Sequence, residues 1–477
     1  MIAAFVSFLP PFGTPAGEIA RATLVAAAFA FIFVTAEAWR RRFHPPAEWT
    51  RKYVHFAGGV VTAFFPWLFR HHWTILALAA LSAGTLGIAR LTGLLGSVHA
   101  VERESKGELY FPVGVYLLFV LARGRPVFYL IALFTLIVAD ALAAVLGKAY
   151  GKHRYLVTSD RRSFEGSAVF LFVAFLCVHL PLLLMTDIDR GASVLIGVQL
   201  ALLVACFEAI STGGNDNLIL PLATYYLLLK MTPRPAAAIG LQLVVQLAIL
   251  GVVLLLAWRT RFLSFSGALA AHLVLYAAFS LGGPQWVIAP ALTLAALLIV
   301  DATVSRTVGV PRGGYHVMAI FYVSLVAVLL IFADNTFATL ARDPGGLGAG
   351  HPFYVLFVGS LAAPLAVLAF QVTGATPRVR RQSTFRRALG SAALGLGAVA
   401  PVGLWQYRSG AFAEGLAVAG AMSGGAIALY LAGRRLLPAP PWSAWDFRLL
   451  TMSVLLATLL ATPFHLRWLG VVGWRLE

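Results

Sequence analysis

The chain has little charge and almost no cysteine. Only 12% of its 477 residues are Asp, Glu, Lys or Arg, whereas 60% are hydrophobic and the mean hydropathy is +0.85. So few charged side chains exclude a soluble protein of this length, because its apolar surface would remain in contact with water. The two cysteines, Cys177 and Cys206, lie in apolar runs, so neither a disulfide framework nor a zinc site is indicated.

Long apolar runs recur along the whole chain and are continuous, not alternating. Runs of about twenty residues match the length of a helix that spans a bilayer, and their continuity argues against a membrane β-barrel. We therefore predict an all-α, polytopic helical integral membrane protein with roughly 14–16 transmembrane segments. The predicted spans lie near residues 20–38, 53–69, 73–92, 109–122, 126–146, 167–186, 192–212, 217–230, 235–257, 262–281, 286–304, 316–333, 353–372, 388–404, 411–433 and 447–463.

Acidic residues are scarce relative to basic ones, at 19 against 36, and the net charge is +17. In a soluble protein this excess would point to nucleic acid, but here it indicates the positive-inside rule and anionic lipid headgroups, so no nucleic-acid partner is expected. Basic residues gather in alternate loops, such as 40–52, 90–108 and 378–387, which fall on one membrane face if the intervening spans form hairpins. The positive-inside rule makes that face cytoplasmic.

Polar residues within the spans are concentrated in the first half of the chain. We predict that residues 1–257 form a membrane domain carrying the functional site. Residues 258–477 are predicted to form a second helical membrane domain. Its apolar helices and basic loops do not indicate a role.

The stretch 140–166, "DALAAVLGKAYGKHRYLVTSDRRSFEG", begins with an acid inside an apolar run. Acids at membrane depth are costly and are candidates for function. A carboxylate can bind Mg²⁺, which commonly bridges to phosphate oxygens, and Lys and Arg complete a phosphate site. The alternative is that Asp140 pairs with a nearby cation and that the basic loop only sets topology. The candidates after Asp140 are Gly147, Lys148, Gly151, Lys152, Arg161 and Arg162.

The end of this stretch strengthens the prediction of a phosphate site. Ser163 can cap the next helix, whose free N–H groups would then face a phosphate. Glu165 is a second acid near the membrane edge, and Gly166 permits close contact.

Another polar block, "FEAISTGGNDNLILPL" at 207–222, places Glu208 inside an apolar run. Asp216 is a candidate second metal ligand, and Asn217 can hydrogen-bond a phosphate, base or sugar. A polar Asn/Gly turn is the alternative, but it explains Glu208 poorly.

Two shorter blocks fall on the same predicted face, and the convergence of all four is more informative than any one. In "RKYVHFAGG" at 51–59, Arg51, Lys52 and His55 lie within about one helical turn. In "SKGELYFPVG" at 105–114, Glu108 precedes Pro112.

Together these blocks resemble the CTP-dependent polyprenol kinase family, which includes dolichol kinases and phytol kinases. "RKYVHFAGG" is similar to its Arg-Lys-x-x-His element and "GELYFPVG" to its Gly-Glu-x-x-Phe-Pro element. The stretch from Asp140 to Ser167 is similar to its central signature, and "EAISTGGNDNLILPL" resembles its Glu…Asp-Asn-Leu-x-x-Pro element. The resemblance covers about residues 40–230. Arg162 departs from it, since the family usually has lysine there.

The resemblance implies transfer of a phosphoryl group from CTP to the hydroxyl of an isoprenoid alcohol such as phytol, dolichol or another polyprenol. It implies that Asp140 and Asp216 hold Mg²⁺ and that Glu165 or Glu208 orients the attacking hydroxyl or a second metal. The location implied is a bacterial inner membrane, with the site facing the cytoplasm. The residues expected to bind the nucleotide are Gly147, Lys148, Gly151, Lys152, Arg161, Arg162, Ser163, Gly166 and Asn217, supported by Arg51, Lys52, His55 and Glu108.

Three other interpretations are weighed against this one. Phosphatidate cytidylyltransferases share the central signature, but their later His-Gly-Gly…Asp-Arg…Asp element is not apparent here. A transporter would place polar residues near the bilayer midplane, whereas these cluster at one edge. The second half, through 263–286 and 332–341, resembles a membrane family that includes phytyl-phosphate kinases, which would imply a fused second kinase step.

Overall fold

The computed structural model describes residues 12–92, 107–158, 160–308, 315–340, 351–375, 381–405, 411–438, 440 and 443–468. This part of the chain is helical apart from one two-stranded hairpin. Eleven of its helices are long and apolar enough to cross a membrane, and the segments His72–Ile88 and Leu109–Leu121 are shorter apolar helices. The predicted class, an all-α polytopic membrane protein, is confirmed.

The chain divides into two compact units, residues 1–244 and 245–477. The boundary falls inside helix α13 (Ala236–Thr260), which also contains the boundary predicted after residue 257.

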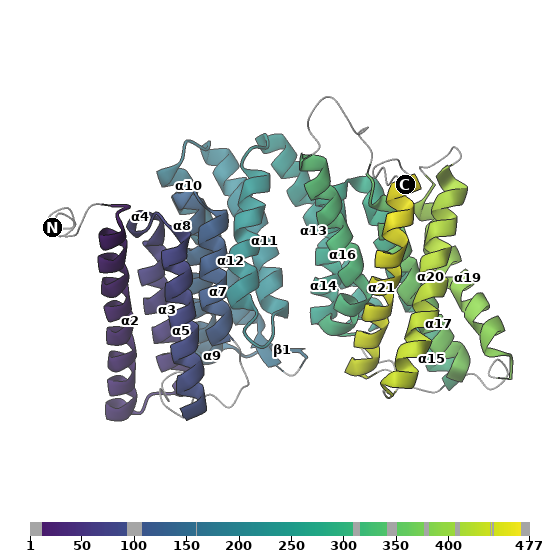
Figure 1. The fold of residues 1–477 in the computed structure, drawn as a ribbon, viewed down its shortest axis with the longest axis horizontal. Helices are drawn as coiled ribbons and strands as arrows, with labels where there is room; N and C mark the ends of the chain where they lie inside the picture. Colours follow the sequence, from purple (N-terminus) through teal and green to yellow (C-terminus); the bar gives the residue numbers. More distant parts are fainter. Residues whose placement is uncertain are drawn as a thin grey trace, which may run out of the picture. The chain divides into compact units, whose positions relative to one another are not determined.

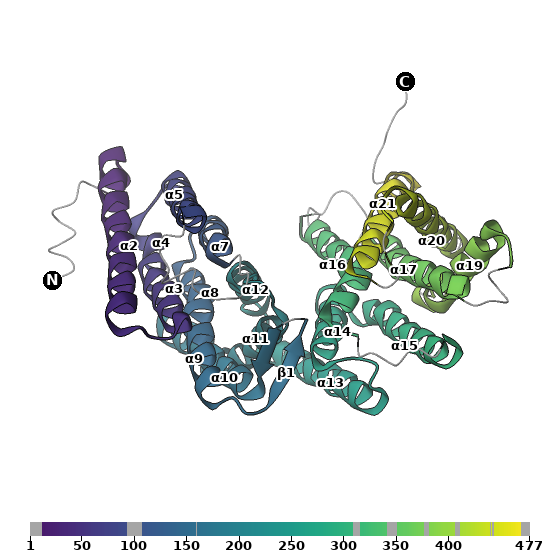
Figure 2. The same cartoon turned by 90° about the horizontal axis from the view of Figure 1, so that it is seen from below.

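Unit 1 is a bundle of helices that carries the hairpin at one end (Figures 1 and 2). The ends of α2 and α9 and the start of α3 lie at that same end of the unit (Figure 1). The elements of unit 1 are α2 (Pro15–Phe43), α3 (Ala47–Ala63), α4 (Phe65–Leu68), α5 (His72–Thr92), α7 (Gly107–Leu121), α8 (Pro126–Phe134), the π-helical turn η1 (Thr135–Ala139), α9 (Asp140–Tyr150), β1 (Arg154–Val157), β2 (Asp160–Ser163), α10 (Phe164–Met185), α11 (Arg190–Ile210) and α12 (Asp216–Met231).

The core of unit 1 lies where α8, η1, α10 and α11 meet. Leu133, Leu136, Phe170 and Ala174 are fully buried there. Helices α8, η1 and α9 follow one another without a break, so the π-helical turn lies inside one span and ends directly before Asp140. A π-turn widens a helix locally and is frequent at functional sites.

The hairpin of β1 and β2 was not predicted from the sequence. The strands are antiparallel, with Arg154 opposite Ser163 and Tyr155 opposite Arg162. Thr158 takes a left-handed conformation at the turn, with φ of 54°. The hairpin therefore folds the basic loop back onto the start of α10.

Unit 2 packs around α17 (Tyr354–Ala375), the most enclosed of the candidate spans. Within this unit, α16, α19, α20 and α21 contact α17. Its other elements are α14 (Phe265–Ala277), the π-helical turn η2 (Ala278–Gly282), the 3₁₀ turn η3 (Pro284–Val287), α15 (Ile288–Val308), α16 (Val317–Leu340), α19 (Thr384–Gly403), α20 (Ala411–Leu436) and α21 (Ala444–Trp468).

Every predicted span overlaps a helix. Those at 53–69, 217–230 and 388–404 correspond to α3, α12 and α19, which do not meet the length and composition expected of a full span. Helix α12 is short and contains Pro221, but it is continuous.

Candidate active site

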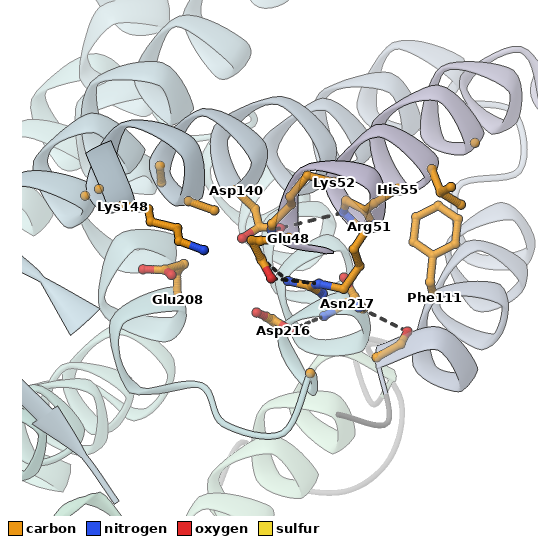
Figure 3. Close-up of a pocket in the computed structure, with 18 of the residues that line it drawn as sticks. Glu48, Arg51, Lys52, His55, Phe111, Asp140, Lys148, Glu208, Asp216 and Asn217 are labelled. Atoms are coloured by element: carbon orange, nitrogen blue, oxygen red, sulfur yellow. Dashed lines mark hydrogen bonds and ion pairs between the residues drawn. The ribbon is translucent and has the colours of Figure 1, made fainter. Parts of the chain in front are cut away.

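A cavity of about 780 Å³ opens in unit 1, and all four polar blocks of the sequence contribute to its wall (Figure 3). The predicted site residues in this wall are Arg51, Lys52, His55, Asp140, Gly147, Lys148, Arg161, Arg162, Ser163, Gly166, Glu208, Asp216 and Asn217. They come from α3, α9, the hairpin, α10, α11 and α12, so tertiary folding gathers side chains that are far apart in the chain.

Four predicted site residues are not among the wall residues that the structure describes. Gly151 ends α9 and Lys152 follows it, exposed. Glu165 instead accepts hydrogen bonds from the backbone N–H of His153, 3.1 Å from its Oε1, and contacts the His153 ring Nδ1 at 2.8 Å. Glu108 lies in the first turn of α7, and its side chain is outside the described part of the structure.

Two side chains of α3, Lys52 and His55, contact the carboxylate of Asp140. The Lys52 Nζ donates to the Asp140 Oδ2 at 2.5 Å, and the His55 Nε2 lies 3.7 Å from the same oxygen. Lys52 and Asp140 are both buried. A buried charge needs a partner because desolvation is costly, so this pair links α3 to α9 across the site.

Glu48, one turn before Lys52, is a wall residue that the sequence analysis missed. Its carboxylate accepts from the Arg51 Nη2 at 2.5 Å. Burial alone would raise the pKa of Glu48, but the hydrogen bond and positive charge of Arg51 outweigh burial and lower that pKa. Glu48 belongs to the same basic block as Arg51, and this i, i+3 spacing is the signal that could have identified it.

Half-buried Arg162 and buried Glu208 form an ion pair that joins the hairpin to α11. The Arg162 Nη2 also donates to the backbone carbonyl of Ser211 at 2.9 Å. Lysine could make one of these contacts but lacks the planar, forked donor that makes both. This geometry explains why arginine suits a position where the family that the sequence resembles usually has lysine.

The loop before α12 is shaped by Gly213 and Gly214, which both have left-handed φ angles, 64° and 85°. They turn the chain so that Asp216 begins α12 at the cavity. The Asn217 Nδ2 donates to the Gly107 carbonyl at 3.0 Å and so ties α12 to α7. Burial, and then the negative charge of Asp140, raise the pKa of Asp216. The two carboxylates therefore share one electrostatic environment.

The glycines of the central signature mainly allow close helix packing. A Cβ on Gly147 would lie 2.9 Å from the Gly166 Cα, so α9 and α10 approach at this point. As predicted, Ser163 caps α10, and its Oγ accepts from the Gly166 N–H at 3.1 Å. The cap and the glycine contact together fix the start of α10 beside the cavity.

Three exposed cations of the cavity wall, Lys148, Arg154 and Arg161, have no ion-pair partner within the described ranges. In the wall as a whole, six Lys and Arg face four Asp and Glu. The remaining positive charge suits an anionic ligand carrying several charges. Arg154 was not in the predicted site, because only the hairpin register shows that it lies beside Ser163.

The donor set is compatible with Mg²⁺ but does not form a complete cage. Among the described residues, no group of three or more His, Cys, Asp or Glu side chains is placed to hold a metal ion. Mg²⁺ is usually held by one or two carboxylates, with waters and substrate phosphates completing its shell. Asp140 and Asp216 supply two such carboxylates facing one cavity (Figure 3).

The corresponding polar residues of unit 2 are arranged differently. Asp334, from the stretch 332–341, accepts from the Phe353 N–H at 3.1 Å with Oδ1 and contacts the His351 Nδ1 at 2.7 Å with Oδ2. Both carboxylate oxygens are therefore engaged inside the protein. A second kinase step in this half of the chain stays a prediction.

The fold and the site define a polytopic membrane enzyme with a charged cavity beside apolar helices. The chain is 31% identical over 198 residues to a phytol kinase from Synechocystis sp., an alignment that covers 40% of this chain and 83% of the relative. It belongs to the phytol kinase-like family of polyprenol kinases. No protein-family model matches the chain, and no solved structure matches it.

Proposed function

We propose that the protein transfers the γ-phosphoryl group of CTP to the hydroxyl of an isoprenoid alcohol. The observation that carries this proposal is the cavity of unit 1, in which exposed cations, two carboxylates and apolar side chains face one another. The relative's activity on phytol supports an isoprenoid acceptor. Such a cavity can bring a water-soluble nucleotide and a membrane lipid together.

In the proposed reaction, the acceptor oxygen forms a bond to the γ-phosphorus, the bond from that phosphorus to the bridging oxygen breaks, and CDP leaves. The acceptor hydroxyl gives up its proton to water, so the products are a prenyl phosphate, CDP and a proton. Lys148, Arg154 and Arg161 bind the phosphates and neutralise their charge, since phosphoryl transfer depends mainly on positioning and charge stabilisation.

Asp140 and Asp216 would hold Mg²⁺, which when bound supplies charge neutralisation at the transferring group. Lys52 and His55 keep Asp140 in place from behind. Glu208 acts through Arg162, its ion-pair partner, and is a positioning residue. Glu165, which pairs with His153 outside the cavity wall, has no direct part in this scheme.

We also propose that the cavity faces the cytoplasm of a bacterial inner membrane. The basic end of α2 lies at the same end of unit 1 as the hairpin, the start of α3 and the end of α9 (Figure 1), and the last three elements carry charged residues of the cavity. The positive-inside rule places such an end on the cytoplasmic side, where CTP is available.

The test is turnover by the purified full-length chain in detergent or nanodiscs, with Mg²⁺, labelled CTP and separate acceptors: phytol, a long polyprenol and phosphatidate. We expect a prenyl phosphate and CDP, and no product when EDTA removes the divalent cations. Release of pyrophosphate with formation of a CDP-lipid would identify a cytidylyltransferase instead. No product with any lipid would overturn the proposal.

A further inference from the structure

The cavity has a second, apolar part that the reaction scheme above does not use. Its wall there consists of Phe29 and Phe33 from α2, Val54 and Gly58 from α3, Ser82 and Leu86 from α5, and Phe111 from α7. We call this part the apolar arm. Ser82 is the one polar side chain of this set.

Each of three helices contributes a pair of residues spaced four apart, which places both members of a pair on one side of the helix. The members are therefore separated by about 6 Å along the helix axis. Three such pairs facing one space form a short channel that runs parallel to the helices.

The direction of the channel follows from α3. Arg51 and Lys52 lie at its charged end, Val54 comes next, and Gly58 lies one turn further from the charges. Residues 44–46 connect α2 to α3, so the two helices are antiparallel and Phe29 lies further from the charged end than Phe33. The arm therefore leads from the site of chemistry toward the interior of the membrane.

Gly58 sets the width of the arm. A Cβ at this position would lie 3.0 Å from the Cε1 of Phe29, closer than side chains ordinarily approach. The edge of the His55 ring packs against Phe111, with ring centroids 5.1 Å apart, where the arm meets the charged part. The Nε2 of His55 is buried there and has no hydrogen-bond partner among the described residues.

We propose that the apolar arm binds the hydrocarbon chain of the acceptor alcohol, along α3 and between α2 and α5, with the hydroxyl next to His55 and Asp140. This assignment rests on the proposed function and adds the chain-binding residues to it. An unbranched or methyl-branched chain fits because the lining is apolar and aromatic, and burial of its methylenes supplies affinity.

The experiment fills the arm and compares two acceptors in the full-length protein. In Gly58→Leu and Ser82→Leu, kcat/KM for phytol should fall by about tenfold or more, because the added side chain displaces the substrate chain. For a short, water-soluble prenyl alcohol that does not reach the arm, kcat/KM should change less than about twofold, and the KM for CTP should not change.

The matched control is Gly84→Leu. It lies two residues from Ser82 on α5, but a Cβ there meets nothing within 4 Å. This control should behave as wild type with both alcohols. If kcat/KM falls equally for the two alcohols in a variant that still binds CTP, the proposal that the arm binds the hydrocarbon chain is wrong. Ser82→Leu keeps the test valid if Gly58→Leu does not fold, since it replaces a residue that already has a Cβ.

A second measurement separates failure of the arm from failure of the proposed function. A phytol analogue with a diazirine at the chain end should label peptides of α2, α3 or α5 upon irradiation, whether or not turnover occurs. Labelling confined to other helices would overturn the arm even if the kinase activity is found. Absence of all turnover, with labelling at these three helices, would overturn the proposed reaction and leave a lipid-binding site.

Discussion

Both units bury acidic side chains in apolar helices, but they use them differently. In unit 1, Asp140 and Asp216 face a cavity of about 780 Å³ together with exposed cations. In unit 2, Asp334 has both oxygens engaged, and Asp446 accepts from the Tyr430 hydroxyl at 2.5 Å and from the Gln371 Nε2 at 3.1 Å. An acid at membrane depth is therefore a functional candidate only when the structure leaves space and charge beside it.

The largest effect is expected when one acid of each unit is neutralised, which tests whether the two units use their acids differently. Asp140→Asn should lower turnover about a thousandfold, because the site loses the charge that faces the transferred group. The matched variant Asp334→Asn should leave kcat within about twofold of wild type, since it changes only a structural contact. Turnover with labelled CTP and size-exclusion profiles measure both effects. Retained activity in Asp140→Asn would contradict its proposed role as a metal ligand.

The exposed cations give the next largest expected effect. Arg161→Ala should raise the KM for CTP about tenfold, because a hydrogen bond to a charged phosphate is worth about 1.5 kcal/mol. Arg386, an exposed cation on α19 of unit 2, provides the control variant Arg386→Ala. Initial rates over a range of CTP concentrations measure the change. A similar increase in the control would mean that CTP responds to overall charge and not to the cavity.

Arg162→Lys tests the departure from the resembling family and should have a smaller effect. Lysine keeps the charge next to Glu208 but cannot also reach the Ser211 carbonyl, so stability should fall by about 1 kcal/mol. Thermal unfolding in detergent measures the loss. By contrast, Arg162→Met leaves Glu208 buried without a partner and should cost about 3 kcal/mol or more. Equal stability of the two variants would mean that the ion pair is not what holds the hairpin.

The smallest effect on activity is expected from Tyr430→Phe in unit 2. Removing the hydroxyl takes a hydrogen bond from buried Asp446, so stability should fall by about 1–2 kcal/mol. Phosphoryl transfer should be unchanged, which thermal unfolding and turnover measured on the same sample can show together. A loss of activity without a loss of stability would indicate that unit 2 takes part in the reaction.

The helical membrane class and the approximate positions of the spans could be predicted from the sequence. A run of apolar residues long enough to cross a bilayer leaves few alternatives, since its backbone must satisfy its own hydrogen bonds in lipid. The hairpin at 154–163 could not be predicted in this way. Its strands are short, mostly polar and set between two helices, so no apolar alternation marks them.

The site was predictable in part for a related reason. Asp140, Glu208 and the four polar blocks stand out because polar side chains are rare in such a chain. Arg154 and Glu48 do not stand out within basic, polar loops, and Glu165 appeared equivalent to Glu208 until the structure placed it against His153. The apolar arm could not be predicted from the sequence pattern, because Phe29 and Leu86 resemble every other apolar residue of their helices.

The sequence by itself determined that the chain is a helical membrane protein and which rare polar residues could do chemistry, because the hydrophobic effect and the cost of burying charge act on local composition. Only the tertiary structure decided which of those residues meet. Lys52 reaches Asp140 across 88 positions of the chain, and Asn217 reaches Gly107 across 110. Such pairings depend on how helices pack, since they join elements that lie far apart in the sequence.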